Sequence, residues 1–178
     1  MVKQVLALVL FFGALVPFSA VAEDSLVRFR GGIGVIPVSS GVAIAPTLPT
    51  ALTVESVNRN IVRGVQPPGQ IWRIRDLRAD VKVDGRITVE GRGLLLAGGN
   101  NIGLNANASV FATLICGVAA PFSLHSSALA GVPLEPNGDF RIDDQLDTVP
   151  TDCASPVLLI RNTGGVWFAV LATGDKAP

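Results

Sequence analysis

Apolar and polar residues alternate along the middle of this 178-residue chain. Between residues 77 and 83 every second residue is apolar, and the same alternation returns between residues 87 and 92. A period of two is typical of a β-strand that buries one face. Asp84-Gly85 separates the two runs, so we predict that they form an antiparallel hairpin.

The charged residues select the register of this hairpin. A three-residue turn at 83–85 places Arg78 opposite Glu90 and Asp76 opposite Arg92. Shifting the turn by one residue would place like charges opposite each other instead. Each cross-strand pair changes the stability by only about 0.2–1 kcal/mol, but all of the pairs favour the first register, which we therefore predict.

A third strand is predicted at residues 104–116, after a Gly/Asn-rich turn at 98–103. We expect it to continue the hairpin as an antiparallel meander that spans residues 70–117. Upstream, Trp72 lies on the wrong parity to share a face with Leu77. The chain is therefore expected to form a bulge, or to pass from one sheet to another, just before the hairpin.

Further strands are expected in the flanking segments, because short apolar or alternating runs recur there between Gly- and Pro-containing turns. These runs lie at residues 26–38, 51–57, 59–65, 122–130, 140–142, 157–161 and 166–172, whereas 39–49 is expected to be a loop. With 19 glycines and 12 prolines, the pattern predicts an all-β fold. We expect an antiparallel β-sandwich, or a flattened β-barrel, of about 8–10 strands.

The first 22 residues have the pattern of a signal peptide. Lys3 precedes an apolar run at 5–16, and Ala20-Val21-Ala22 matches a cleavage site. The alternative is an uncleaved membrane anchor, but the apolar run is short for a membrane span. We therefore expect residues 23–178 to form a single all-β domain, secreted or periplasmic, without stable membrane insertion after cleavage.

Cys116 and Cys153 are the only two cysteines. In an exported chain they are expected to form one disulfide, which the chain-entropy model values at roughly 4 kcal/mol for a loop of this length. The alternative is two buried free thiols. Two cysteines and the single histidine, His125, are too few ligands for a zinc site, so we expect no metal centre of that type.

The sequence offers little for catalysis or for nucleic-acid binding. Fourteen basic residues equal fourteen acidic ones, which does not favour phosphate-backbone binding. His125 and the adjacent Ser126 would point to opposite faces of a strand, although Ser127 would share the face of His125. We find neither a G-x-S-x-G motif nor a phosphate loop, and we expect no enzyme activity and no cofactor.

Four aspartates gather in the segment that ends at Cys153, namely Asp143, Asp144, Asp147 and Asp152. They could form a calcium site, although the spacing of an EF-hand loop is missing, or they could belong to a solvated loop. A glycosidase would need two of them across one cleft. Trp72 and Trp167 lie on apolar strands and are interpreted as core residues rather than as sugar platforms.

Four large apolar residues lie on the otherwise polar face of the predicted meander: Leu94, Leu96, Phe111 and Ile115. A loop or the second sheet could cover them. The alternative is that they form a partner surface or a ligand groove.

Three functional hypotheses follow from the sequence. The first is an exported, non-catalytic β-sandwich that acts by binding or assembly with an unknown protein or envelope partner. The second is a small β-barrel that holds an apolar ligand in an internal cavity. The third is a carboxylate-dependent hydrolase, which requires two of the four aspartates to face one cleft.

Overall fold

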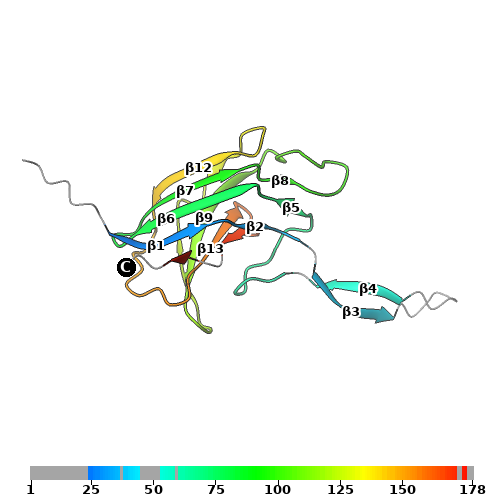
Figure 1. Ribbon diagram of the computed structural model, residues 1–178, viewed down its shortest axis with the longest axis horizontal. Helices are drawn as coiled ribbons and strands as arrows, with labels where there is room; N and C mark the ends of the chain where they lie inside the picture. Colours follow the sequence, from blue (N-terminus) through cyan, green and yellow to red (C-terminus); the bar gives the residue numbers. More distant parts are fainter. Residues whose placement is uncertain (1–23, 37, 45–52, 59, 172–173, 176–178) are drawn as a thin grey trace, which may run out of the picture.

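The computed structural model describes residues 24–36, 38–44, 53–58, 60–171 and 174–175 (Figure 1). All regular elements in these residues are strands, of which ten have four or more residues and five have two. They are β1 (Ser25–Arg30), β2 (Ile33–Gly34), β3 (Val38–Ile44), β4 (Thr53–Asn58), β5 (Trp72–Arg73), β6 (Asp76–Lys82), β7 (Arg86–Arg92), β8 (Leu95–Leu96), β9 (Ser109–Cys116), β10 (Ser123–Ser126), β11 (Val132–Pro133), β12 (Phe140–Gln145), β13 (Val157–Asn162), β14 (Trp167–Leu171) and β15 (Gly174–Asp175). The predicted all-β class is confirmed.

Two antiparallel sheets pack as a sandwich. The first sheet has the order β12-β7-β6-β1-β15, and the second has the order β10-β9-β13-β14-β2, with β11 also paired to β9. Figure 1 shows the longer strands of the first sheet side by side, with β9 and β13 crossing behind them. Neither sheet closes on itself, so the sandwich prediction is correct and the flattened-barrel alternative is wrong. Two small sheets, β3-β4 and β5-β8, complete the described strands.

The predicted hairpin is formed by β6 and β7 in the predicted register. Arg78 pairs with Glu90, and Asp76 pairs with Arg92. Gly85 takes a φ of 86° in the turn, and its N–H donates to the carbonyl of Lys82 at 3.0 Å. Residues on β6 and β7 alternate between buried and more exposed positions, as expected for a sheet with one solvent-facing side.

The third strand of the predicted meander belongs to the other sheet, so this part of the prediction is wrong. β9 pairs with β10 and β13, while β12 takes the place beside β7. From Val110 to Cys116 every residue of β9 is buried, and a strand without a polar face fits the middle of a sheet that is covered on both sides. The strand also begins later than residue 104, because Ala106 and Asn107 adopt positive φ angles in a turn.

The parity break before the hairpin marks a change of sheet, as one of the two alternatives predicted. Trp72 lies in β5, which pairs with β8, and four residues later β6 joins the first sheet. A similar change occurs at Gly31-Gly32, since β1 belongs to the first sheet and β2 to the second. A Cβ atom on Gly32 would lie 2.8 Å from the side chain of Leu77, so the crossing chain passes directly over the core.

Two segments differ from the predicted pattern near residue 50. The predicted loop at 39–49 contains most of β3, whose partner β4 confirms the strand predicted at 51–57. The strand predicted at 59–65 is instead a turn with a single bridge between Val62 and Val65. Arg63 and Gly64 both have positive φ angles, which are incompatible with an extended strand.

The core between and around the sheets is filled by one continuous cluster of apolar side chains. β13 and β14 lie inside the second sheet, and nearly all of their residues are buried, as their apolar runs predicted. Both tryptophans are core residues. The indole N–H of Trp167 donates to the carbonyl of Asn60 at 3.0 Å, which satisfies its only polar group.

Cys116 and Cys153 form the predicted disulfide, and both residues are buried. The bond joins the end of β9, in the second sheet, to the segment that follows β12 of the first sheet. A disulfide is compatible with an oxidising extracellular or periplasmic compartment. The predicted signal peptide at 1–22 lies outside the described residues. Within the described residues we find no helix that could cross a membrane.

Candidate functional site

The predicted apolar patch is not a surface. Leu94, Leu96, Phe111 and Ile115 are each 3% exposed or less. The guanidinium of Arg161 lies over the Phe111 ring at 5.3 Å, and Arg63 donates a hydrogen bond to the Ile115 carbonyl at 2.8 Å. Of the two alternatives that the sequence left open, cover by the chain itself is therefore the correct one, and these residues do not form a partner surface or groove.

The sequence left a calcium site and a solvated loop open for the acidic segment, and the four aspartates do not converge on an ion site. The described residues contain no group of three or more side chains that could hold a metal ion. Asp143 forms an ion pair with Arg141 at 3.5 Å, and Asp152 is exposed. The Asp144 carboxylate accepts the Ala128 N–H at 2.7 Å.

Asp147 holds the acidic segment against the edge strand β10. Its carboxylate accepts the Ser126 N–H at 3.0 Å, and its own N–H donates to the Ser126 carbonyl at 2.8 Å. β10 is the last strand of the second sheet, so these bonds satisfy backbone groups at an open edge. The acidic segment therefore closes one side of the sandwich.

His125 belongs to the same closure. Its Nδ1 lies 3.1 Å from the carbonyl oxygen and 2.7 Å from the hydroxyl oxygen of Thr148. Nε2, the other ring nitrogen, lies 3.2 Å from the hydroxyl oxygen of Ser123. The imidazole thus joins β10 to the acidic segment. The sequence interpretation considered Ser126 and Ser127 but missed Ser123, although a spacing of two residues places it on the face of His125.

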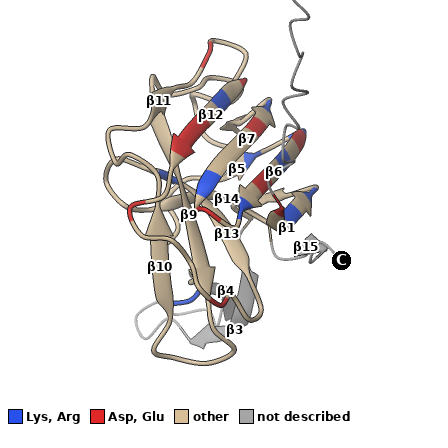
Figure 2. Ribbon diagram, turned by 90° about the vertical axis from the view of Figure 1, so that its left-hand side faces the viewer, with Lys and Arg blue, Asp and Glu red and all other residues tan. Residues whose placement is uncertain are grey.

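The outer face of the first sheet carries most of the charge on the sandwich (Figure 2). Side chains in register across the strands form two rows on this face. The first row is Arg141, Glu90, Arg78 and Arg30, and the second is Asp143, Thr88, Asp80 and Arg28. Figure 2 shows blue and red segments on β12, β7, β6 and β1.

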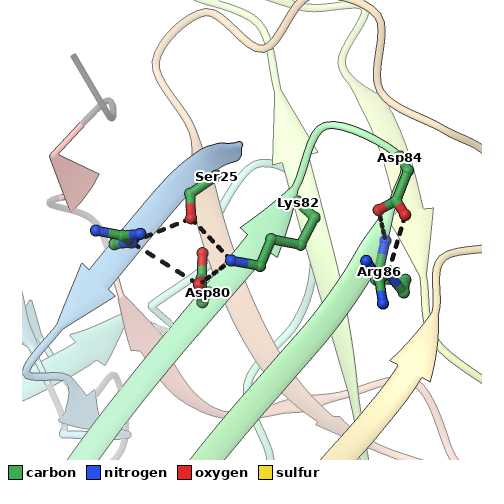
Figure 3. Close-up of polar contacts among 6 residues, drawn as sticks. Ser25, Asp80, Lys82, Asp84 and Arg86 are labelled. Carbon is green, nitrogen blue, oxygen red and sulfur yellow. Dashed lines mark hydrogen bonds and ion pairs between the residues drawn. The ribbon is translucent and has the colours of Figure 1, made fainter. Parts of the chain in front are cut away.

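Asp80 is the centre of a compact polar cluster (Figure 3). Its Oδ2 lies 2.8 Å from Nζ of Lys82 and 3.8 Å from Nε of Arg28, and both cations also donate to the Ser25 hydroxyl. Burial raises the pKa of Asp80, but hydrogen bonds from Lys82 and Ser25 and the charges of Lys82 and Arg28 outweigh that effect, so the pKa is lowered. The other oxygen, Oδ1, is buried and has no hydrogen-bond partner in the described structure.

A hollow of about 190 Å³ lies between the two rows of charges. Its lining combines three arginines with two carboxylates, one hydroxyl and two apolar residues: Arg28, Arg30, Arg78, Asp80, Glu90, Thr88, Phe29 and Ala79. A second hollow of about 330 Å³ shares Glu90 with the first and lies between β7 and β12, where its charged lining residues are Arg92, Arg141, Glu135 and Asp139. The first hollow is the candidate binding site, since it combines concavity with an excess of cations.

Sequence reasoning missed this hollow. Arg30 and Arg78 are far apart in the chain, and only the pairing of β1 with β6 brings them together. The available signal was the alternation of Arg28 and Arg30 with apolar neighbours, which placed both arginines on the solvent face of a strand.

Comparison with protein-family models, with curated proteins and with solved structures finds no match to this chain.

Proposed function

We propose that this chain is an exported, non-catalytic β-sandwich protein that acts by binding, in the periplasm or outside the cell, through the outer face of its first sheet. One observation carries the proposal. The hollow on that face places two arginines opposite each other, although like charges in directly opposing positions destabilise a sheet. Such an arrangement favours a ligand or partner that supplies the missing negative charge.

Two further features support binding at the surface rather than inside the fold. The core cluster is continuous and the sheets do not close into a barrel, which leaves the apolar-ligand hypothesis without a supporting observation. The disulfide suits an exported protein, and the signal peptide expected from the sequence would supply the route. We expect the partner to be a component of the cell envelope or of the extracellular medium.

Site-specific photo-crosslinking in cells tests the binding face. A photoreactive residue replaces Thr88, which lines the hollow, and in a matched variant it replaces Leu124, which is exposed on the second sheet. We expect a discrete adduct from position 88 and none from position 124. No adduct at 88, or the same adducts from both positions, would contradict binding through the first sheet.

The export step has its own test. N-terminal sequencing of the protein from the periplasm or the medium is expected to begin at Glu23. A chain that stays in the cytoplasm, or one that retains residues 1–22, would contradict export by a cleaved signal peptide.

A further inference from the structure

Each of the two open sheets has two edges, and the chain itself covers all of these edges but one. Asp147 and the segment around it lie against β10, and β15 pairs with β1 at the far edge of the first sheet. At the far edge of the second sheet, the Val35 carbonyl next to β2 accepts the backbone N–H of Trp72, so β5 continues beyond it. The remaining edge is β12, for which we find no further strand partner among the described residues (Figure 1).

The backbone of β12 directs unpaired groups towards this edge. The Leu146 N–H donates to the Gly85 carbonyl, and in an antiparallel pair every second residue bonds to the same neighbour. The even-numbered residues of β12 therefore bond to β7, whereas Arg141 and Asp143 point their N–H and carbonyl groups away from it. In the described part of the chain no hydrogen bond reaches these groups. Such an edge is a template for another strand.

The chain closes both ends of the open stretch. The Asp139 carbonyl accepts the Glu135 N–H at 2.9 Å, and the Gln145 N–H donates to the carboxylate of Asp144 at 2.8 Å. The two residues with free backbone groups lie between these positions. A partner strand therefore has to match a short stretch that carries one cation and one anion.

We propose that β12 pairs with β12 of a second copy of this chain, antiparallel and about a two-fold axis at Ile142. In this register, Arg141 of each copy lies opposite the partner's Asp143. Each opposed pair exchanges its N–H and carbonyl groups, so the bonds use every free backbone group of the stretch in both copies. This inference goes beyond the proposed function, because it needs neither the hollow nor its ligand.

The charges on β12 favour this register over its neighbours. Moving the axis to Arg141 would set two arginines opposite each other, and moving it to Asp143 would set two aspartates opposite each other. A shift by a single residue would oppose free backbone groups to groups that β7 already occupies. Like charges in directly opposing positions are destabilising, which is the same rule that selects the register of β6 and β7.

Arg141 can serve both copies at once. Its guanidinium forms an ion pair with Glu90 and lies 3.5 Å from the carboxylate of Asp143 in its own strand. A guanidinium has several donors, so Arg141 keeps Glu90 while it reaches the partner's Asp143. Charges of one sign on an edge strand repel a second sheet, whereas this cation and anion attract each other across the axis. The charges therefore select the register, and the backbone bonds hold the strands together.

The dimer joins the first sheets of both copies into one continuous sheet. A two-fold axis perpendicular to a sheet keeps the outer faces of both copies on the same side. Both candidate hollows then face the same way, so a repetitive surface can engage them together and gain affinity over a single site.

Analytical ultracentrifugation of the disulfide-bonded exported protein at low ionic strength tests the self-association. We expect a monomer–dimer equilibrium with a Kd on the order of 100 µM, because an interface of two short strands is small. A protein that stays monomeric up to about 1 mM, roughly tenfold above this value, overturns the proposal.

Charge reversal tests the register. Arg141→Asp and Asp143→Arg each set like charges opposite each other in the dimer, and we expect each to weaken self-association by about tenfold or more. Asp152→Arg is the matched control, since it makes the same change of charge at an exposed position outside β12, and it should alter the Kd by less than about twofold. Equal effects of Asp143→Arg and of the control overturn the assignment to β12.

A mixture of the two reversed variants gives a gain of binding. The Arg141→Asp chain is acidic at both positions and the Asp143→Arg chain is basic at both, so opposite charges face each other only in a mixed pair. We expect a heterodimer about as tight as the wild-type dimer. Absence of the heterodimer, with both variants folded by circular dichroism and thermal unfolding, overturns the register.

Asp143→Pro tests the backbone bonds, with Asp143→Ala as its control. Both substitutions remove the charge, but only proline also removes the N–H, which makes no bond to β7. We expect the proline variant to dimerise about tenfold more weakly than the alanine variant, with thermal unfolding verifying that both are folded. Equal Kd values overturn pairing through the backbone. A crosslink from position 88 to another protein would stand even if the chain is monomeric, so the two proposals fail separately.

Discussion

Trp72 stacks on Phe168 with ring centroids 4.0 Å apart and an interplanar angle of 12°. The contact joins the small β5–β8 sheet to β14 of the second sheet. Trp72 is 3% exposed, and its backbone N–H donates to the Val35 carbonyl at 3.1 Å. The ring and the backbone therefore hold the chain at the same point. This stack fixes the chain just before it enters β6 and therefore positions the first sheet against the second.

Trp72→Ala is expected to lower the free energy of unfolding by about 3–5 kcal/mol, because it removes a buried aromatic side chain and leaves a cavity. Trp72→Phe keeps a ring that can stack on Phe168 and should lose less than half as much. Urea unfolding followed by circular dichroism measures both. A loss below about 1 kcal/mol for the alanine variant would show that the stack does not hold the sheets together.

Cys116→Ala/Cys153→Ala is expected to destabilise the protein by about 2–5 kcal/mol, because the disulfide closes a loop between residues 37 positions apart. Thermal unfolding with and without a reductant provides the control. The reductant should lower the Tm of the wild type and leave the double variant unchanged. A wild-type Tm that is the same in both conditions, with reduction verified by thiol titration, contradicts this contribution.

Gly91→Ala is expected to destabilise the protein by about 1–3 kcal/mol through overpacking. A Cβ atom at this position would lie 2.1 Å from a ring carbon of Phe140, which covers Gly91 from the neighbouring strand β12. Gly69→Ala is the matched control, since no atom lies within 4 Å of the added Cβ, and it should be neutral or slightly stabilising. Equal effects of the two substitutions on urea unfolding would mean that the ring does not occupy this position.

The Asp80 cluster predicts a pH dependence of stability. The pKa of Asp80 is lower in the folded protein than its ordinary value of 3.8, so its ionised form stabilises the fold above about pH 4. This contribution is lost as the pH falls through the folded-state pKa. The difference in unfolding free energy between the wild type and Asp80→Asn should therefore be largest above about pH 5 and shrink towards pH 3.

Lys82→Met provides the comparison, because it removes the cation that hydrogen-bonds to Asp80 at 2.8 Å. In this background the pH-dependent effect of Asp80→Asn should be smaller. Urea unfolding from pH 3 to pH 7 measures all four proteins of the cycle. A wild-type difference that stays constant across this range contradicts a lowered Asp80 pKa.

Local features of the sequence were sufficient for most of the longer strands and for the β6–β7 hairpin. A period of two, the Asp-Gly turn and opposite charges at Arg78 and Glu90 all act between residues close in the chain, and they fix the register without help from the rest of the fold. The two cysteines likewise left one pairing in an exported chain. Apolar runs such as β13 correctly indicated strands inside a sheet.

The choice of sheet for each strand was decided only in the tertiary structure. The alternation in residues 104–116 predicted a strand, but β9 pairs with β13 rather than β7, because its second apolar face has to be covered. A period of two shows which residues share a face of a strand, but it does not show which strands pair with it. Leu94 and Phe111 needed a cover for the same reason, and the chain itself supplies it.

The sequence by itself therefore determined an all-β chain, one hairpin register and one disulfide, since each of these depends on short-range pattern or on the only available partner. The tertiary structure decided that Asp147 caps the edge of β10 instead of holding an ion. It also decided that Arg30 faces Arg78 across a hollow. Both arrangements require pairing between distant segments, and that pairing is set by how the whole apolar core is covered rather than by any local pattern.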